Sequence, residues 1–444
     1  MSGASGRYHA EYAWLPDRPE PDADVLFEVT DGRFTRVAPA SPAPPDARRL
    51  PGLTLPGLAN AHSHAFHRAL RGHAQGRGDF WSWRDRMYAV ADRLDPDRYL
   101  ALARAAYAEL ALAGVTCVGE FHYLHHRRDG GRYHDPNAMG AALVEAAAQA
   151  GIRITLLDTC YLTASVDGQP LTGPQRRFGD GDATRWAERA GAFAPRGDHV
   201  RVGAAVHSVR AVPADQLGTV AAWAAERGAP LHVHLSEQPA ENDACLAYHG
   251  RTPTALLADA GVLGPHTTAV HATHLTVADR RLLGAAGTGV CLCPTTERDL
   301  ADGIGPAREL ADAGCPLSLG SDSHAVVDLF EEARGMELDQ RLATRARGHF
   351  APAELLAAAS TTGHAALGWR DAGRLAPGQR ADLVTVRLTS VRTAGVPPVG
   401  VLFAATAADV TDVLVDGRPV VVAGRHATVD VPAELAAAIK AVTA

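Results

Sequence analysis

The stretch Leu58-Ala59-Asn60-Ala61-His62-Ser63-His64-Ala65 is a short apolar run that ends in two histidines. The same arrangement recurs along the chain, where other apolar runs end in His234-Leu235-Ser236-Glu237, His271-Ala272-Thr273-His274 and Ser321-Asp322-Ser323-His324. Short runs rich in Val, Ile and Leu, separated by Ala-rich amphipathic stretches, are typical of buried strands that alternate with helices. The sequence therefore predicts a strand-and-helix repeat in which several strands end in polar motifs.

Eight apolar runs qualify as strands of one parallel barrel. They cover Leu58–Ala65, Val115–Tyr123, Ile152–Leu162, Val200–Val212, Pro230–Gln238, Thr267–Leu275, Gly289–Glu297 and Pro316–His324. The helices predicted between them include Pro96–Ala113, Ala138–Ala150, Asp182–Phe193, Pro213–Arg227 and Pro253–Ala260. Because a strand-and-helix unit takes roughly 30 residues, eight units fill most of the distance from Leu58 to Trp369. We therefore expect an α/β fold with a TIM-like (β/α)8 barrel over residues 58–373.

The two ends of the chain predict a second, smaller domain. Residues 1–57 and about 374–431 contain short apolar runs, with turns at Asp31-Gly32 and Asp416-Gly417. Asp-Gly between two apolar runs is a strong signal of a tight hairpin turn. We expect residues 1–57 and 374–444 to form one small β-sandwich beside the barrel.

Composition favours a globular enzyme over a membrane or nucleic-acid-binding protein. The 444 residues are 46% hydrophobic, enough to bury a large core, and the formal net charge is −7. No run approaches the ~20 apolar residues of a membrane span, and Met1–Tyr12 lacks the pattern of a signal peptide. We expect a cytoplasmic protein without a nucleic-acid or membrane partner. The six cysteines fall mostly in predicted strands, which favours reduced core thiols.

The polar motifs predict a metal site. In a barrel of this kind, chemistry takes place at the carboxyl ends of the strands, which is where each motif begins. Imidazole nitrogens and one carboxylate suit a borderline cation such as zinc, with water in the remaining coordination position. We expect His62, His64, His234 and Asp322 to hold one Zn²⁺. The same ligands would also hold iron or manganese.

The scarcity of lysine excludes one kind of metal centre. Barrel hydrolases that hold two metal ions commonly bridge them with a carbamylated lysine at the end of the fourth strand. The only lysine of this chain is Lys440, beyond the last predicted strand, and the fourth strand, Val200–Val212, contains none. A pair of ions bridged by lysine is therefore excluded, and a single ion is expected.

The same motifs resemble those of a known family. The carriers are Pro56-Gly57-Leu58 before His62-Ser63-His64, then His234-Leu235-Ser236-Glu237, Ser321-Asp322, Gly373-Arg374-Leu375-Ala376-Pro377-Gly378 and Ala381-Asp382-Leu383. On these residues the chain resembles the aminohydrolases of the amidohydrolase superfamily. A narrower set resembles the N-formimino-L-glutamate deiminases, also called formimidoylglutamate deiminases. That set is Phe80-Trp81-Ser82-Trp83-Arg84-Asp85, Glu120-Phe121-His122-Tyr123-Leu124-His125-His126, His207-Ser208-Val209-Arg210 and Gly320-Ser321-Asp322-Ser323-His324.

The resemblance implies hydrolytic deamination of a linear amidine. N-formimino-L-glutamate and water would give N-formyl-L-glutamate and ammonia, a step of histidine degradation. Zinc lowers the pKa of its bound water from 15.7 toward ~7, and Asp322 can both ligate the metal and accept the water proton. Glu237, three residues after His234, would carry a proton to the departing nitrogen, a transfer typically worth 10²–10⁴ in rate. His271 would orient the attacking hydroxide, as the matching histidine does in the family.

Substrate selection is expected from residues that do not touch the metal. The two carboxylates of glutamate call for cationic or hydrogen-donating partners, and guanidinium binds carboxylate bidentately. Arg210 and Arg84 are the candidates for the two carboxylates, and Tyr123 is a further donor. His207 is another candidate contact. So is His67, which stands where the family pattern usually has glutamine.

Two alternatives have to be weighed against this hypothesis. One is a ring-amidine aminohydrolase of the same superfamily, acting on guanine or an adenosine derivative. Such pockets need aromatic stacking and amide donors more than paired arginines, so Arg84 and Arg210 favour the dicarboxylate. The other is a non-enzymatic scaffold, which should have lost the metal ligands, whereas the whole set is present here. A homodimer is expected because it is usual in the family.

Overall fold

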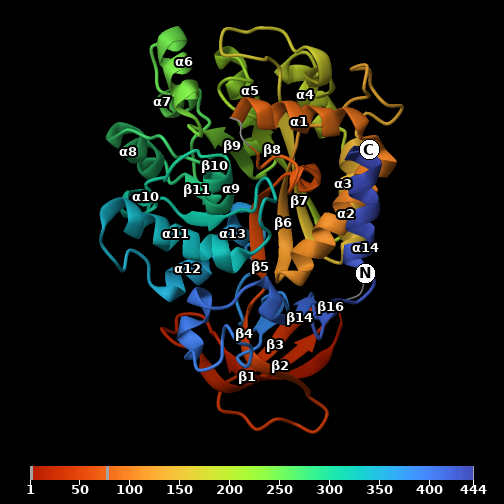
Figure 1. Cartoon of the computed structure of the whole chain (residues 1–444), viewed down its shortest axis with the longest axis vertical. Helices are drawn as coiled ribbons and strands as arrows, with labels where there is room; N and C mark the ends of the chain where they lie inside the picture. The colour runs from red at the N-terminus through yellow and green to blue at the C-terminus, as the bar shows by residue number, and fades with distance from the viewer. Residues whose placement is uncertain (1–3, 77–79, 444) are drawn as a thin grey trace.

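Eight parallel strands form the centre of the protein, which a computed structural model describes for residues 4–76 and 80–443. The side chains of Phe80 and Trp81, from the aromatic motif noted above, lie outside the described residues. Each strand pairs with its sequence neighbour, and Figure 1 shows the helices around them. The strands are β5 (Leu58–Ser63), β6 (Val115–His122), β7 (Arg153–Cys160), β8 (Val200–Val206), β9 (Leu231–Leu235), β10 (Thr267–His271), β11 (Gly289–Leu292) and β12 (Leu317–Leu319).

Backbone contacts join the first strand of this sheet to the segment that follows the last. Ser63 and Asp322 form a parallel bridge. The N–H of Asp322 donates to the carbonyl of His62 at 3.0 Å, and the N–H of His64 donates to the carbonyl of Asp322 at 3.2 Å. The expected barrel is confirmed, and its closure places two candidate ligands from the start of the barrel beside one from its end.

Helices cover the outside of the barrel. Asp95 caps the start of helix Pro96–Leu112 by accepting the N–H of Arg98 at 2.9 Å. Gly151 ends helix Ala138–Ala150 in the left-handed region, at φ +75°. The five predicted helices correspond to α2 (Pro96–Leu112), α3 (Ala138–Ala150), α4 (Ala183–Gly191), α5 (Ala214–Glu226) and α7 (Pro253–Asp259). The others are α1 (Phe80–Arg93), α6 (Pro239–His249), α8 (Val277–Ala285), α9 (Pro294–Asp299), α10 (Ala307–Asp312), α11 (Leu329–Thr344), α12 (Pro352–Ala359), α13 (Thr361–Ala366) and α14 (Val431–Thr443). Short 3-10 turns are η1 (Ala65–Leu70), η2 (Gly173–Arg177), η3 (Pro398–Phe403) and η4 (Ala407–Asp409).

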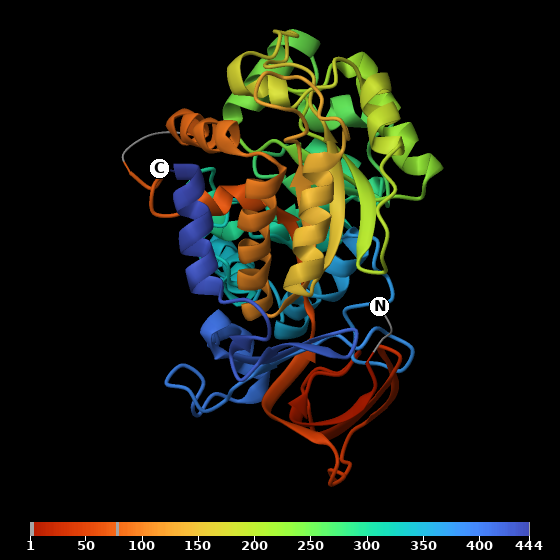
Figure 2. The ribbon, with the colours of Figure 1, turned by 90° about the vertical axis from the view of Figure 1, so that its right-hand side faces the viewer.

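Both ends of the chain contribute to a second sheet, as the sequence predicted. Its order is β16-β15-β14-β13-β4-β1-β2-β3, a single hydrogen-bonded series that curls around its own apolar cluster (Figure 2). The turns predicted at Asp31-Gly32 and Asp416-Gly417 have positive φ angles at all four residues. The strands are β1 (Gly6–Ala13), β2 (Asp22–Thr30), β3 (Arg33–Ala38), β4 (Arg48–Pro56), β13 (Leu383–Val386), β14 (Val410–Val415), β15 (Arg418–Val422) and β16 (Arg425–His426).

A buried arginine connects the barrel to this second sheet. Arg153, at the start of β7, is fully buried and donates to Asp382 at 3.0 Å and to Asp416 at 3.3 Å. The backbone N–H of Asp416 also donates to Asp382, at 2.9 Å. Because a buried guanidinium needs such partners, the barrel and the sheet depend on each other at this junction.

The last helix requires a correction to the predicted division of the chain. Residues 374–444 were expected to belong to the small domain, but α14 packs against α2 of the barrel (Figure 1), where Glu434 pairs with Arg104. The apolar face of α14, with Leu435 and Val442 buried, explains this placement.

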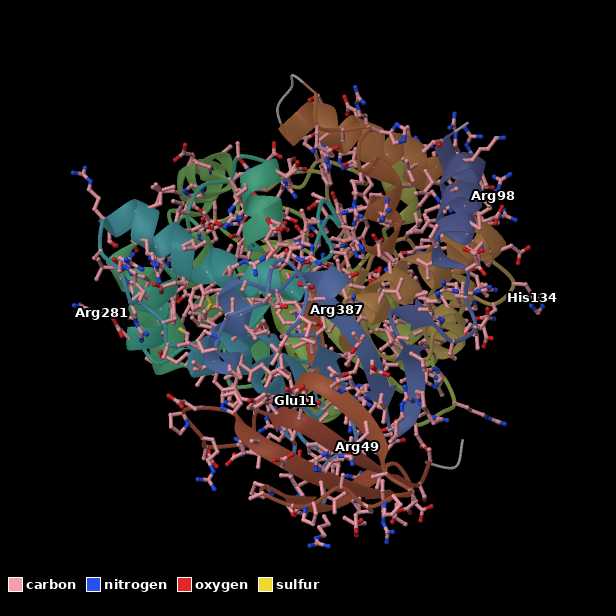
Figure 3. All side chains as sticks on the ribbon, turned by 60° about the horizontal axis from the view of Figure 1, so that its bottom comes forward. Glu11, Arg49, Arg98, His134, Arg281 and Arg387 are labelled. Atoms are coloured by element: carbon pink, nitrogen blue, oxygen red, sulfur yellow. The ribbon has the colours of Figure 1, made fainter. Side chains whose placement is uncertain are left out.

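The surface of the protein is polar. Charged and polar residues such as Arg98, His134 and Arg281 point outward (Figure 3). Within the described residues, no helix has the length and apolar character to span a membrane.

Candidate active site

Four predicted ligands converge at the carboxyl end of the barrel. His62 lies in β5 and His64 directly follows it, His234 lies in β9, and Asp322 follows β12. The Nε2 atoms of His62 and His234 are 3.1 Å apart. Asp322 Oδ1 lies 3.3 Å from His62 Nε2 and 3.4 Å from His64 Nε2. The structure therefore brings together the whole set that the strand ends predicted.

Within the described residues, the candidate ligand atoms form two groups that share His62, namely His62 with His64 and Asp322, and His62 with His234 and His271. The separations measured within the four-residue set match those of ligands on one ion. Ligands 2.0–2.1 Å from a common ion at a tetrahedral angle lie about 3.3–3.4 Å apart. The observed separations are 3.1 to 3.4 Å. His64 and His234 use their Nδ1 atoms on the backbone carbonyls of Phe121 at 3.0 Å and His207 at 2.9 Å, which leaves Nε2 as the ligand atom.

The protonation of the site also suits a metal. Burial lowers the pKa of His62, lowers that of His64 to about 3, and lowers that of His234 well below its ordinary value. These imidazoles are therefore neutral, as metal ligation requires. Burial alone would raise the pKa of Asp322, but its hydrogen bond with His62 and the nearby histidines hold that pKa well below its usual range. The site therefore offers a metal ion three neutral imidazoles and one carboxylate.

The backbone bends sharply where the polar motifs leave the strands. His271 and Asp322 have φ angles of +65° and +41°, in the left-handed region that non-glycine residues seldom occupy. The backbone hydrogen bonds between Asp322 and β5 hold this conformation, and the N–H of Ala272 donates to the carbonyl of Leu235 at 3.0 Å. These bends point the motif side chains across the mouth of the barrel. Such strain is common at functional sites.

Three acidic side chains surround His271. Its Nε2 lies 3.9 Å from Glu237 Oε1 and 3.9 Å from Asp322 Oδ2, and its Nδ1 lies 3.4 Å from Glu297 Oε1. Burial alone would lower the pKa of His271, but Glu237, Glu297 and Asp322 raise it well above its ordinary value. Burial also raises the pKa of Glu237. The predicted catalytic residues Glu237, His271 and Asp322 therefore lie within reach of one another.

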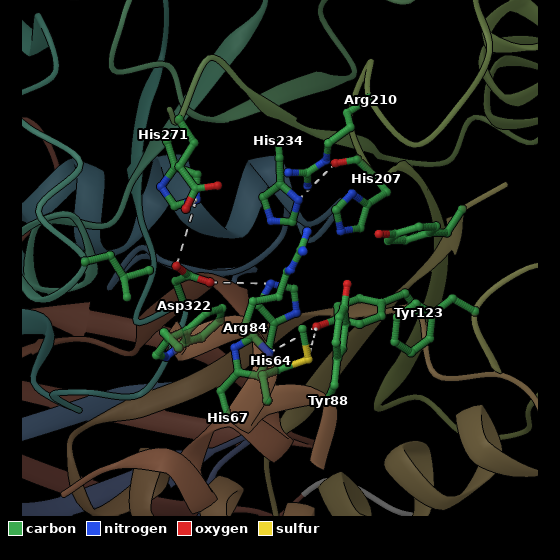
Figure 4. Close-up of a pocket in the computed structure, with 16 residues that line it drawn as sticks. His64, His67, Arg84, Tyr88, Tyr123, His207, Arg210, His234, His271 and Asp322 are labelled. Carbon is green, nitrogen blue, oxygen red and sulfur yellow. Dashed lines mark hydrogen bonds and ion pairs between the residues drawn. The ribbon is translucent and has the colours of Figure 1, made fainter. Parts of the chain in front are cut away.

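A pocket opens in front of this group (Figure 4). All five side chains that the sequence proposed as substrate contacts line it. They are His67, Arg84, Tyr123, His207 and Arg210. His64, His234, Glu237, His271 and Asp322 line it as well, so three of the four candidate metal ligands share one cavity with the two arginines.

His67 and Tyr123 contact each other in the wall of the pocket. His67 Nε2 lies 3.0 Å from the phenolic oxygen of Tyr123, and both residues are buried. Burial lowers the pKa of His67 well below its ordinary value, so this imidazole is neutral. His67 also lies against His64, with 4.5 Å between ring centroids. A histidine at this position therefore supplies a neutral hydrogen-bonding group next to a candidate ligand.

The sequence did not identify several residues of the pocket. Tyr88, Tyr161, Trp83, Met87, Phe178 and Leu300 complete its lining. Tyr161 directly follows a strand, which is a signal that could have revealed it. Tyr88 lies inside α1 and has no such signal. Glu297, on α9, was also missed, although it accepts the N–H of Cys293 at 2.8 Å and contacts His271.

A second missed group lies beneath the ligands. Glu120, at the end of β6, accepts the N–H of Ala65 at 2.8 Å and the hydroxyl of Ser63 at 2.9 Å. Ser63 also contacts His324 Nε2 at 2.8 Å. Burial raises the pKa of Glu120 to about 8. These contacts hold the backbone between His62 and His64 in place.

Comparison with known proteins gives a consistent result. A model described as the amidohydrolase family matches residues 53–422. The chain is 38% identical to a formimidoylglutamate deiminase of Pseudomonas aeruginosa, over 94% of this chain and 95% of the relative. It is 33% identical to an 8-oxoguanine deaminase of the same organism, over 94% of this chain and 93% of that relative.

Solved structures show the same likeness. An amidohydrolase from Brucella melitensis has a TM-score of 0.90 at 34% identity, covering 99% of this chain and 100% of that one. An adenosine deaminase from Xanthomonas campestris with bound zinc has a TM-score of 0.86 at 25% identity, covering 98% and 97%.

Proposed function

This chain belongs to the amidohydrolase family, and we propose that its site hydrolyses the terminal amidine of N-formimino-L-glutamate, giving N-formyl-L-glutamate and ammonia. One observation carries the proposal. Arg84 and Arg210 line the same cavity as Glu237 and three of the candidate metal ligands, His64, His234 and Asp322. Such a pocket presents cations for two carboxylates and a hydrolytic group for the amidine at the other end. The 38% identity to a formimidoylglutamate deiminase supports the same substrate.

The four ligands fit a divalent ion, and zinc is proposed because a solved relative binds it. When bound, the ion supplies Lewis acidity and a water of lowered pKa. The two oxygens of Asp322 then have separate roles. Oδ1 faces His62 and His64, whereas Oδ2 faces His271, which leaves Oδ2 as the acceptor for the proton lost by the attacking water.

The proton balance of the reaction assigns a role to Glu237. Water forms a new C–O bond at the amidine carbon, and the bond from that carbon to the terminal nitrogen breaks. The departing nitrogen must gain protons to leave as ammonia. Because burial raises the pKa of Glu237, its acid form persists to higher pH than that of an exposed glutamate. Glu237 therefore donates the proton, and the charged His271 stabilises the oxygen that becomes the formyl carbonyl.

A second candidate is hydrolysis of a purine amidine. The aromatic side chains of Tyr88, Tyr123, Tyr161 and Phe178 in the pocket wall would suit a planar base. The 33% identity to an 8-oxoguanine deaminase supports this candidate as well. The two arginines favour the dicarboxylate, because guanidinium groups bind carboxylates bidentately and a neutral base offers no carboxylate.

Ammonia release by metal-analysed protein separates these candidates. N-formimino-L-glutamate, N-formimino-L-aspartate, guanine and 8-oxoguanine would be compared at equal concentration. We expect the highest kcat/KM with the glutamate derivative and a lower value with the shorter aspartate derivative. Turnover of a purine without turnover of either formimino compound would overturn the proposal.

A further inference from the structure

Two phenols in the pocket wall share one hydrogen-bond donor. Gln175, in η2, lies with its Nε2 atom 3.1 Å from the phenolic oxygen of Tyr88 and 3.4 Å from that of Tyr161. Tyr88 comes from α1 and Tyr161 follows β7, so three separate segments meet here. Figure 4 shows Tyr88 among the side chains that line the pocket. Gln175 itself is only 7% exposed, so water does not compete for the hydrogen bonds that its amide makes.

The orientation of the Gln175 amide follows from its other contact. Its Oε1 accepts the backbone N–H of Thr172 at 3.4 Å. An amide that accepts with its oxygen must present its NH₂ group to the phenols. Both phenolic oxygens therefore accept a hydrogen bond from Gln175, and the proton of each phenol remains available to a different acceptor.

The segment that carries Gln175 is anchored firmly. Arg177, two residues further along η2, is fully buried. It donates to the backbone carbonyls of His126 at 2.9 Å and Leu94 at 2.7 Å, and also to that of Ala91 near the end of α1. The same turn thus ties down α1, which carries Tyr88 and Arg84. The relative positions of these groups are fixed before a ligand arrives.

The surroundings of the two phenols define the acceptor that would suit them. Tyr88 and Tyr161 line the cavity with Arg84 and Arg210. The guanidinium of Arg84 lies 5.5 Å from the ring centroid of Tyr88. Arginine has no acceptor atom, so neither guanidinium can receive a phenolic proton. Burial raises the pKa of Tyr88 above its ordinary value, so this phenol keeps its proton.

We propose that Tyr88 and Tyr161 determine specificity by donating hydrogen bonds to a substrate carboxylate, and that Gln175 is the positioning residue that fixes both phenols as donors. The inference rests on the proposed function, because it takes the ligand to be a dicarboxylate. A carboxylate offers roughly four acceptor sites, and one bidentate arginine fills about two of them. Neutral phenols fill more of these sites without adding positive charge to the pocket.

Four variants test the assignment. Tyr88→Phe and Tyr161→Phe each remove one donor. Gln175→Glu keeps an acceptor for the Thr172 N–H but replaces the amide donors with a carboxylate that would itself attract the phenolic protons. Tyr248→Phe, on the exposed side of α6, is the matched control. Thermal unfolding and metal content of each variant show whether it is folded and loaded.

We expect KM for N-formimino-L-glutamate to rise roughly tenfold to a hundredfold in each phenylalanine variant, the range for a lost hydrogen bond to a charged group. Gln175→Glu should raise KM at least as much, because it redirects both phenols. The value of kcat should stay within about threefold, since the reacting carbon is untouched. The Tyr248→Phe variant should match the wild type.

Calorimetric binding of N-formyl-L-glutamate separates this inference from the proposed function. If the wild type binds this dicarboxylate more tightly than the three pocket variants but does not deaminate the formimino compound, the assignment stands and the proposed function fails. If all proteins bind it equally, the assignment is overturned. If the wild type binds no dicarboxylate, both are overturned.

Discussion

Replacing Glu237 by glutamine tests the central step of the proposed mechanism. The substitution keeps the size and hydrogen-bonding shape of the side chain but removes its ability to donate and accept a proton. Glu237 Oε1 is 3.9 Å from His271 Nε2, and Glu237 is not among the four candidate metal ligands. We therefore expect the metal content and KM of Glu237→Gln to stay close to those of the wild type.

The expected effect lies in kcat. A positioned proton donor is worth about 10²–10⁴ in rate, which corresponds to about 2.7–5.4 kcal/mol of activation free energy. Burial strengthens the effect, because little water can reach the departing nitrogen in place of the carboxyl group. The side chain of Glu237 is only 17% exposed. We therefore expect the loss to fall in the upper half of that range.

Glu241→Gln provides a matched control for this experiment. Glu241 follows four residues later, and burial raises its pKa as well. It accepts the N–H of Ser236 at 3.1 Å and lines a neighbouring cavity with Arg210 rather than contacting His271. Its replacement should lower kcat by less than tenfold.

Steady-state ammonia release at several pH values, with zinc measured on the same samples, gives the answer. If Glu237→Gln retained more than a tenth of the wild-type kcat with full metal occupancy, Glu237 would not be the proton donor. A loss of metal together with activity would place Glu237 among the ligands instead.

Four further predictions follow from the same structure. A chelator should abolish activity and lower the melting temperature, and added zinc should restore both, because the ion binds only the folded site; activity in the metal-free protein would contradict this. Arg210→Met should raise KM roughly tenfold to a hundredfold at unchanged zinc content, whereas exposed Arg281→Met should not; lost metal would show that Arg210 has another role. Burial raises the pKa of Glu120 from 4.5 to about 8. Between these two pH values the folded protein therefore binds more protons than the unfolded chain. The free energy of unfolding should therefore fall as pH rises from about 5 to 8, and urea titrations should show a shallower fall for Glu120→Gln. Arg153→Met should lower the free energy of unfolding by about 3–5 kcal/mol, because Asp382 stays buried without its cation while Asp416 keeps only its pairing with Arg380; an unchanged urea midpoint would refute this.

The barrel could be predicted from the sequence because its strands are unusually apolar and end in polar motifs. The run Ala138–Ala150 matches α3 to the residue, since Gly151 terminates it. Other predicted elements were longer than those in the structure. The run Thr267–Leu275 contains β10 only as far as His271, because the backbone turns into the left-handed region there. No sequence pattern marks such a bend in a residue other than glycine.

The candidate site, like the fold, was predicted from the sequence only in part. His62, His64, His234 and Asp322 could be found because each lies at or shortly after the carboxyl end of a strand, and these ends meet on one rim of a barrel. Tyr88 and Gln175 lie in a helix and a short turn that reach the pocket only through tertiary packing. The anchoring of η2 by Arg177 brings them there, and nothing in their local sequence indicates it.

The buried Arg153 junction bears on the order of events during synthesis. Arg153 is translated 229 residues before Asp382 and 263 residues before Asp416. At 5–20 residues per second, the ribosome needs about 10 to 50 s to supply both carboxylates. Until then the third barrel strand carries a guanidinium that the finished fold keeps from water. We therefore expect nascent chains that stop before Asp416 to remain sensitive to proteases and to bind chaperones.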